Sequence, residues 1–304
     1  MQRLLPRSCV LMSVYRGTRF LSEQLESIAR QCGTEVHIHA RDDGSDDDTS
    51  VVFETVCSRL GLSATLERGI NVGASGSFLA LIATAPLGYD LYAFADQDDV
   101  WEEDKLARAA VALSAVAGPA LVAAGHRIVN EQLHDIGRSQ VPRQIGLGNA
   151  LVENIVQGAA CALNPSGFEL VVALGKPVGI IMHDWWLYLV LSALGTVIYD
   201  EASVLRYRQH DKNVVGTNAS RTRALLQRAS HHFTQPPRLR GQASALLELA
   251  GERMDVSQRA LVGRFLSAYG HPVRQLALAA DRSIWRQRKL DDLIMRMLVM
   301  AGRY

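Results

Sequence analysis

Apolar residues along the first hundred positions occur in two alternating patterns. A short apolar run over residues 8–14 predicts a buried strand, and residues 20–31, where apolar residues recur every three or four positions, predict a helix. The same two patterns then repeat, with strands expected over 36–40, 64–67 and 91–95 and helices over 51–60 and 77–85. Strands and helices that alternate at this pace are typical of βαβ units, so the sequence predicts an α/β domain with a mainly parallel sheet.

The pattern is less regular after residue 100. We expect a helix over 102–117, a strand over 120–124, loops over 125–149, a strand over 155–163, a helix over 166–174, and a helix over 183–194 that leads to a strand over 196–199. Pro236-Pro237 marks 231–240 as a linker or a tight break, and the stretches compatible with helices beyond it are 243–254, 257–269 and 283–299. The expected organisation is an α/β domain over residues 1–218 followed by a mainly helical extension over residues 219–304.

Three features bear on the compartment. Residues 185–199 carry no charged side chain, but a membrane span needs roughly twenty apolar residues, so we expect a buried helix that runs into a buried strand. The N-terminus has neither the long apolar stretch nor the small-residue cleavage site of an export signal. The four cysteines lie far apart and form no CxxC pair, which is typical of a reducing compartment. The sequence therefore predicts a cytoplasmic protein.

The formal net charge of +1 hides an uneven distribution. Residues 221–304 hold 15 Lys and Arg against 6 Asp and Glu, whereas the rest of the chain holds 17 basic and 25 acidic residues. A basic tail on an acidic body indicates an anionic partner for the tail, such as a lipid surface. A solvated helical face that packs on the acidic body explains the same pattern, and both interpretations stay open. No nucleic-acid partner is expected.

Two acidic clusters each follow a predicted strand. One is Asp42-Asp43 and the other is Asp96-Gln97-Asp98-Asp99. Ligands of open α/β sheets bind beyond the carboxyl ends of the strands, so both clusters can meet at one crevice. Three carboxylates within four residues repel one another unless a cation neutralises them, and hard oxygen ligands suit Mg²⁺ or Mn²⁺. An acidic turn that caps the helix starting near Trp101 is the other interpretation.

These segments resemble family 2 glycosyltransferases. FADQDDVW (94–101) is similar to the DxD region of the family, above all in its rhamnosyltransferase-like branch. SVYRGTRFLSEQLESI (13–28), RDDGSDDDT (41–49) and RGINVGASGSF (68–78) resemble, in the right order, the opening nucleotide loop and helix, the DDGSxDxT signature and the NxGxxxNF stretch. HDWW (183–186) and YRQHDKNVVG (207–216) extend the resemblance to about residue 216. Ser77 departs from it, because the family often has Asn there.

The resemblance implies a GT-A fold, a nucleotide-diphosphate-sugar donor and a divalent metal ion, Mg²⁺ or Mn²⁺. It implies that Asp42 hydrogen-bonds the pyrimidine base, that Tyr15 packs near the base, and that Asp96 meets the ribose or the metal. Asp98 would be the principal metal ligand, with Asp99 as the next candidate. The other expected donor-binding residues are Asp43, Arg68, Asn71 and Arg208.

Two later residues complete the expected site. The family places an Asp at the start of a helix in a motif like that of Asp184, and inverting transfer requires a base that takes the proton of the acceptor hydroxyl. Asp is also a favoured helix N-cap residue, and the two roles are compatible. His210 is expected to ligate the metal or contact the diphosphate, while Arg206 or Arg208 offsets the charge of the leaving group. A surface loop with ordinary charges is the alternative for this segment.

The implied function is an inverting, metal-dependent glycosyl transfer of the hexosyltransferase type. Rhamnose, carried on dTDP or UDP, is the favoured sugar, and the acceptor is a cell-surface polysaccharide such as an O-antigen, or a lipid-linked glycan. Peripheral contact with the inner face of the membrane through the basic C-terminal region is a further expectation. The alternatives are a non-catalytic nucleotide-sugar-binding subunit of a glycan assembly complex and a nucleotidyltransferase.

Overall fold

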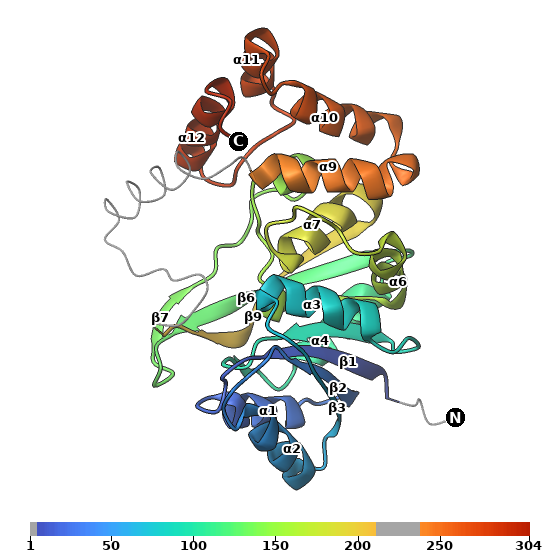
Figure 1. Cartoon of the computed structure of the whole chain (residues 1–304), viewed down its shortest axis with the longest axis vertical. Coiled ribbons are helices and arrows are strands. Elements are labelled where there is room, and N and C mark those ends of the chain that lie inside the picture. Colours follow the sequence, from blue (N-terminus) through green and yellow to red (C-terminus); the bar gives the residue numbers. More distant parts are fainter. Residues whose placement is uncertain (1–4, 211–237) are drawn as a thin grey trace. The chain divides into compact units, whose positions relative to one another are not determined.

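The computed structural model describes residues 5–210 and 238–304, which fall into two compact units (Figure 1). The first unit contains the chain up to Val141 together with Val156–Lys176 and Gly195–Gln209, and the second contains Pro142–Ile155, Pro177–Leu194 and the chain from His210 onwards. The expected boundary between residues 218 and 219 lies outside the described residues, so that division stays a prediction. Two segments expected within the α/β domain nevertheless group with the C-terminal helices.

A nine-stranded sheet forms the centre of the first unit, in the order β3-β2-β1-β4-β8-β6-β9-β5 with β7 beside β6. Its strands are β1 (Arg7–Val14), β2 (Glu35–Asp42), β3 (Ser63–Arg68), β4 (Leu91–Ala95), β5 (Val100–Trp101), β6 (Ala120–Val129), β7 (Asp135–Arg138), β8 (Cys161–Leu163) and β9 (Thr196–Arg208). Strands β1 to β4 pair in parallel, whereas β8 runs antiparallel between β4 and β6. The predicted α/β fold class with a mixed sheet is confirmed.

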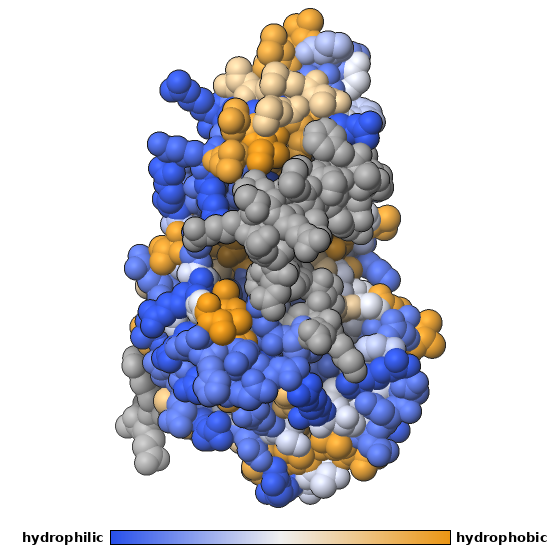
Figure 2. Space-filling view, turned by 90° about the vertical axis from the view of Figure 1, so that its left-hand side faces the viewer, coloured by the Kyte–Doolittle hydropathy of each residue, from blue (hydrophilic) through white to orange (hydrophobic). Residues whose placement is uncertain are grey.

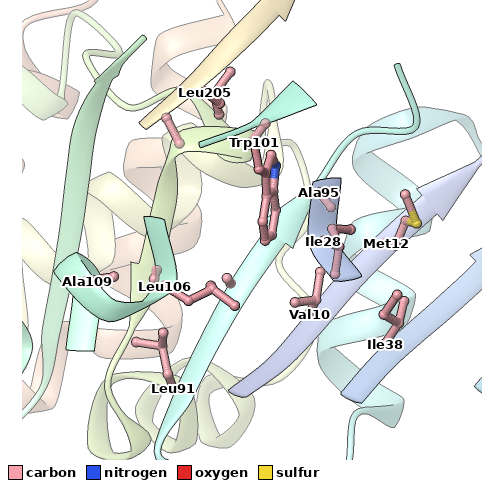
Figure 3. Close-up of a cluster of buried hydrophobic side chains, with 14 of the residues drawn as sticks. Val10, Met12, Ile28, Ile38, Leu91, Ala95, Trp101, Leu106, Ala109 and Leu205 are labelled. Carbon is pink, nitrogen blue, oxygen red and sulfur yellow. The ribbon is translucent and has the colours of Figure 1, made fainter. Parts of the chain in front are cut away.

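Helices cover both faces of this sheet, with α1 and α2 on one side and α3 and α6 on the other (Figure 1). The helices of the unit are α1 (Leu21–Ala29), α2 (Thr49–Leu60), α3 (Gly73–Thr84), α4 (Lys105–Ser114) and α6 (Pro165–Leu174), with a short 3₁₀ turn at Gly158–Ala160. Successive strand residues point to opposite faces. Val10 and Met12 of β1 therefore join residues of α1, α2 and α4 in one buried cluster (Figure 3). On the other face, Tyr92 of β4 stacks on Phe168 of α6, with ring centroids 3.7 Å apart.

The second unit is helical. It contains α5 (Leu147–Ala150), α7 (His183–Leu194), α9 (Arg238–Ala250), a 3₁₀ turn at Gly251–Arg253, α10 (Val256–Ser267), α11 (Pro272–Ala280) and α12 (Lys289–Met300). Helix α7 is buried along most of its length and packs against α5 and α9. Among the described residues, no helix combines the length and the hydrophobicity that crossing a bilayer requires.

Several predicted elements differ from the observed ones. The strand expected over 196–199 extends as β9 to Arg208, and the strand expected over 155–163 is reduced to Cys161–Leu163. The expected loops over 125–149 contain the end of β6 and all of β7. Helix α11 was not predicted, and the helix expected over 283–299 begins at Lys289. The last expected linker residues, 238–240, are the start of α9.

Candidate active site

Three loops of the first unit begin at the same edge of the sheet. In the register of the parallel strands, Val14 at the end of β1 pairs with Asp42 at the end of β2, and Met12 of β1 pairs with Ala95 at the end of β4. Tyr15, the Asp42-Asp43 pair and the acidic cluster 96–99 therefore follow neighbouring strands at their carboxyl ends. This is the crevice position at which open α/β sheets bind ligands.

Gln97, in the middle of the acidic cluster, joins two of these loops. The backbone N–H of Tyr15 donates to Gln97 Oε1 at 2.7 Å, and Gln97 Nε2 donates to the Tyr15 carbonyl at 2.9 Å. Gly17 leaves room for this amide, because a Cβ at residue 17 would lie 2.2 Å from Gln97 Oε1. Gln97 was not among the predicted site residues. Its one signal in the sequence is that it is a neutral amide among three carboxylates.

Asp42 is held by the loop that follows β2. Its side chain is 4% exposed, its Oδ1 accepts from the backbone N–H of Ser45 at 2.8 Å, and its Oδ2 accepts from the Ser50 hydroxyl. Burial by itself raises the pKa of Asp42, but the hydrogen bonds from Ser45 and Ser50 and the charge of Arg68 outweigh it and leave the pKa below its usual value. The side chain is thus an ionised acceptor in a fixed orientation.

Asp43 is buried and binds the start of α3. Its carboxylate accepts from the backbone N–H groups of Val72 at 3.0 Å and Gly73 at 2.9 Å, and it pairs with the buried Arg41 guanidinium. These bonds satisfy N–H groups that have no partner within a helix, and they explain why α3 begins before the predicted residue 77. Asn71 is exposed and its side-chain oxygen accepts from Gly73 at 3.2 Å.

The three carboxylates of the acidic cluster differ in exposure. Asp96 and Asp98 are half-buried, whereas Asp99 is fully buried. Asp99 Oδ1 accepts from the backbone N–H of Arg208 at 3.1 Å, and Oδ2 has no hydrogen-bond partner among the described residues. Burial, and then the charges of Asp98 and Asp96, hold the pKa of Asp99 well above its ordinary value. Asp96 and Asp98 are therefore the carboxylates of the cluster that a ligand can reach.

A buried lysine lies near this cluster in the same unit. Lys105 Nζ donates to the Ala159 carbonyl at 2.5 Å and stands 3.2 Å from the centroid of the Trp101 ring. Burial lowers the pKa of Lys105 to about 7, against the opposing charges of Asp99 and Asp96.

Arg208 binds the protein around the acidic cluster with its whole guanidinium group. The side chain is 2% exposed; Nε donates to the Asp98 carbonyl at 2.8 Å, and the two terminal nitrogens donate to the Glu131 carbonyl and the Glu23 carboxylate. The guanidinium also lies 4.4 Å from the centroid of the Phe20 ring. Its expected contact with the donor stays a prediction, while the contacts observed here fix the backbone of Asp98.

Arg68, the other expected cationic contact, lies on the surface. Its side chain is 62% exposed and donates to Glu54 at 3.0 Å, in an ordinary surface ion pair. Its Cα is the register partner of Asp42 across β2 and β3, which places it beside the same sheet edge.

The remaining expected residues belong to the second unit. Asp184 lies in the first turn of α7, is 7% exposed, and accepts at Oδ1 from its neighbour Trp185 N–H at 2.6 Å and from Asn154 Nδ2 at 3.1 Å. Burial lowers the pKa of His183 to about 3, so the adjacent imidazole is neutral near pH 7. His210 follows β9 directly and is half-buried. Lys212 and Asn213, of the same motif, lie outside the described residues.

The carboxylates of the first unit suit a divalent cation only in part. Over residues 5–210 and 238–304, no three His, Cys, Asp or Glu side chains are arranged to hold a metal ion by themselves. Mg²⁺ is commonly held by one or two carboxylates together with substrate phosphates. The half-buried pair of Asp96 and Asp98 fits that donor set, and the unpartnered Oδ2 of Asp99 adds a buried oxygen to the same loop.

Known proteins are similar to this chain in sequence and in fold. The sequence model of glycosyl transferase family 2 matches residues 9–164. The chain is 29% identical over 224 residues to the dTDP-rhamnosyl transferase RfbG of Shigella flexneri, which covers 69% of this chain and 75% of that relative.

Solved structures agree with these relatives. The structure is similar to that of S. aureus TarS 1–349, with a TM-score of 0.60 and 13% identity, and the match covers 98% of this chain and 87% of that one. It is also similar to the complex of TarS 1–349 with UDP, with a TM-score of 0.58 and 13% identity, and that match covers 86% of this chain and 71% of that one. It is similar as well to the mannosyltransferase PcManGT of Pyrobaculum calidifontis, solved with GDP-Man and Mn²⁺, with a TM-score of 0.52 and 17% identity over 98% and 87%. At such identities these structures support the GT-A fold.

Proposed function

The chain belongs to glycosyl transferase family 2 and is a glycosyltransferase, and from this premise we propose an inverting transfer of rhamnose from a dTDP- or UDP-linked donor. The acceptor in this proposal is a cell-surface polysaccharide or a lipid-linked glycan at the inner face of the membrane. The choice of rhamnose rests on the similarity to a dTDP-rhamnosyl transferase over 69% of the chain. The use of a nucleoside diphosphate is supported by the complexes of TarS with UDP and of PcManGT with GDP-Man.

One observation carries the proposal: hydrogen bonds join the loop of the acidic cluster to the loop that follows β1. The paired hydrogen bonds of Gln97 and Tyr15 hold half-buried carboxylates beside a half-exposed aromatic ring, at the carboxyl ends of adjacent parallel strands. A nucleotide needs an aromatic or apolar surface for its base and a cation for its diphosphate, and this edge offers groups for both. The nearby Asp42 supplies a fixed acceptor for the base.

The proposed roles follow from these positions. Tyr15 and Asp42 bind the base, and Asp43 holds the start of α3 in place beside them. Asp96 and Asp98 hold Mg²⁺ or Mn²⁺, which when bound neutralises the charge on the departing diphosphate. Asp99, Arg68, Asn71, Arg208 and His210 stay predicted contacts of the metal or the donor.

We propose Asp184 as the base that takes the proton of the acceptor hydroxyl as its oxygen attacks the anomeric carbon. Its Oδ1 accepts from two N–H donors, which fixes the orientation of the carboxylate. His183 is a poor alternative because burial lowers the pKa of its imidazole to about 3, which makes the ring a weak base.

Donor hydrolysis and acceptor transfer test the proposal. A panel of nucleotide sugars is incubated with the protein and Mn²⁺ or Mg²⁺, and release of the nucleoside diphosphate is measured; dTDP-rhamnose should give the highest rate. Asp184→Asn should abolish transfer to an acceptor while the Kd for the donor stays unchanged. Asp255→Asn is the matched control, because Asp255 is an exposed helix-capping Asp of the second unit. Loss of donor binding in Asp184→Asn would contradict the assignment as base, and hydrolysis of no donor would contradict the proposed reaction.

A further inference from the structure

Helix α12 presents an apolar side to solvent. The exposed residues Leu290, Leu293, Met297 and Met300 follow one another at spacings of three and four positions. With 3.6 residues per turn they fall within an arc of about 80° on the helix. The buried residues of α12 lie on the opposite side and are Met295, Leu298 and Val299. A surface helix normally turns polar side chains to water, so an apolar outer side needs a separate explanation.

The neighbouring helix α11 continues this surface. Val273 is 83% exposed and Leu276 is 63% exposed, and α11 packs against α12. Arg296 of α12 fixes the two helices together, because its guanidinium donates to the Ala279 carbonyl of α11 at 2.5 Å and to the Ile284 carbonyl at 3.0 Å. Figure 2 shows hydrophobic residues gathered over these C-terminal helices at the top of the molecule, with hydrophilic residues on either side. The apolar face is defined here as Val273, Leu276, Leu290, Leu293, Met297 and Met300.

The well-exposed charged side chains of residues 256–304 are of one sign, although the exposed acidic residues Glu252 and Asp255 lie just before this stretch. Between residues 256 and 304, every charged side chain that is well exposed is basic: Arg259, Arg264, Arg274, Arg282, Arg288, Lys289 and Arg303. The acidic residues of this stretch are Asp281, Asp291 and Asp292, and all three are half-buried. Asp281 binds Arg264 and Asp292 binds Arg296, which reduces their contribution to the surface charge.

We propose that the apolar face of α11 and α12 docks on an anionic lipid bilayer. Exposed Leu and Met side chains would enter the boundary between headgroups and acyl chains, while the surrounding arginines and Lys289 contact lipid phosphates. This combination of an apolar stripe with basic residues beside it is the pattern of a helix that lies in the membrane interface. This surface belongs to the second unit, and its docking does not depend on the identity of the donor sugar.

The charge pattern selects the bilayer over a second copy of the chain. A symmetric dimer would place the same surface of both copies face to face, and here each copy would bring a set of exposed basic residues with no exposed acidic partner between 256 and 304. Like charges brought together oppose such a contact. An anionic membrane would instead attract the exposed basic residues, and its hydrocarbon region would accommodate the side chains of the apolar face.

Vesicle co-sedimentation of the full chain tests the proposal. The protein should bind vesicles of equimolar phosphatidylglycerol and phosphatidylcholine and should bind vesicles of phosphatidylcholine alone far more weakly. A variant with Leu290→Gln, Leu293→Gln and Met297→Gln should lose on the order of ten-fold or more in affinity for the anionic vesicles. A matched control carries Val51→Gln and Val111→Gln, which replace exposed helical residues of the first unit and should bind like the wild type.

A second variant tests the charges separately. Each basic residue near an anionic surface contributes about 1 kcal/mol, so Arg274→Gln with Lys289→Gln should weaken binding to anionic vesicles about 30-fold, and the salt dependence of binding should decrease. Failure of the wild type to bind anionic vesicles would overturn the proposal, as would unchanged binding by the triple variant. A triple variant that unfolds at lower temperature would show that the stripe packs within the protein. A wild type that dimerises where the triple variant is monomeric would assign the face to a second copy. Donor hydrolysis by the same samples separates these outcomes from failure of the proposed reaction.

Discussion

Replacing Gly17 by alanine should detach the acidic cluster from the loop after β1 with little disturbance elsewhere. A Cβ at this position would lie 2.2 Å from Gln97 Oε1 and 2.7 Å from its Cδ, and its three nearest neighbours all belong to this amide. Gly17 does not have a positive φ, so alanine is compatible with the backbone. The Gln97 side chain must therefore rotate away, and both of its hydrogen bonds to Tyr15 are broken.

The magnitude follows from those two bonds. Each contributes about 0.5–1.5 kcal/mol to stability, and Tyr15 is exposed enough for water to replace the lost partner. We therefore expect Gly17→Ala to lower the free energy of unfolding by ~1 kcal/mol. The functional effect should be at least as large, because Asp96 and Asp98 flank Gln97. We expect the Kd for a nucleoside diphosphate with Mn²⁺ to rise about ten-fold, which corresponds to ~1.4 kcal/mol.

A double-mutant cycle measures this effect. Gly17→Ala, Gln97→Ala and the double variant are compared by urea unfolding and by titration calorimetry with the nucleoside diphosphate and Mn²⁺. Because both substitutions break the same bonds, the double variant should resemble either single variant, with a coupling energy of ~1 kcal/mol. Gly263→Ala in α10 is the control, because no atom lies within 4 Å of its Cβ position, and it should stabilise the helix by up to ~1 kcal/mol. Additive effects of Gly17→Ala and Gln97→Ala would refute the reasoning.

Two further predictions concern buried charge and pH. Arg208→Met leaves the acceptors around a buried cation without their donor, so urea unfolding should show a free energy of unfolding lower by ~3–5 kcal/mol. Arg206 is half-exposed, so Arg206→Met should change this free energy by under ~1 kcal/mol. Equal effects of the two substitutions would contradict the observed burial of Arg208. Burial holds the pKa of His183 near 3 in the folded protein, against 6.5 ordinarily. As the pH falls, the unfolded chain therefore binds a proton at this position before the folded protein does. The free energy of unfolding should decrease below about pH 6.5, by at most ~5 kcal/mol at about pH 3. His183→Leu should flatten this part of the stability profile, and an unchanged slope would assign the acid sensitivity to other groups.

Strong periodic patterns made part of the fold predictable. The apolar run over 91–95 coincides with β4, and the helix expected over 183–194 coincides with α7. Strand β9 was underestimated because Asp200 and Glu201 interrupt its apolar pattern directly after the predicted segment 196–199. Helix α11 was missed because it has only nine residues and most of its apolar side chains face solvent. Its apolar residues therefore do not mark the buried side of the helix.

The candidate site was predictable as residue types but not as contacts. Strand ends and the family resemblance were enough to single out Asp42 and the cluster around Asp98. The partners that hold these residues are remote in sequence, however: Gln97 binds Tyr15 across 82 positions, and Arg208 binds the Asp98 carbonyl across 110 positions. An arginine next to a predicted phosphate site is expected to bind phosphate, and only the packing shows that its nitrogens already have acceptors in the protein.

The interleaved order of the two units has a consequence for the newly made chain. Helix α7 is complete at Leu194, but its neighbour α9 ends at Ala250. At about 5–20 residues per second, the apolar side chains of α7 spend roughly 3–11 s without that neighbour during synthesis. The first unit, by contrast, has all its strands once β9 ends at Arg208. A slowed ribosome would lengthen this interval, and the hydrophobic residues of α7 are where a chaperone would be expected to bind.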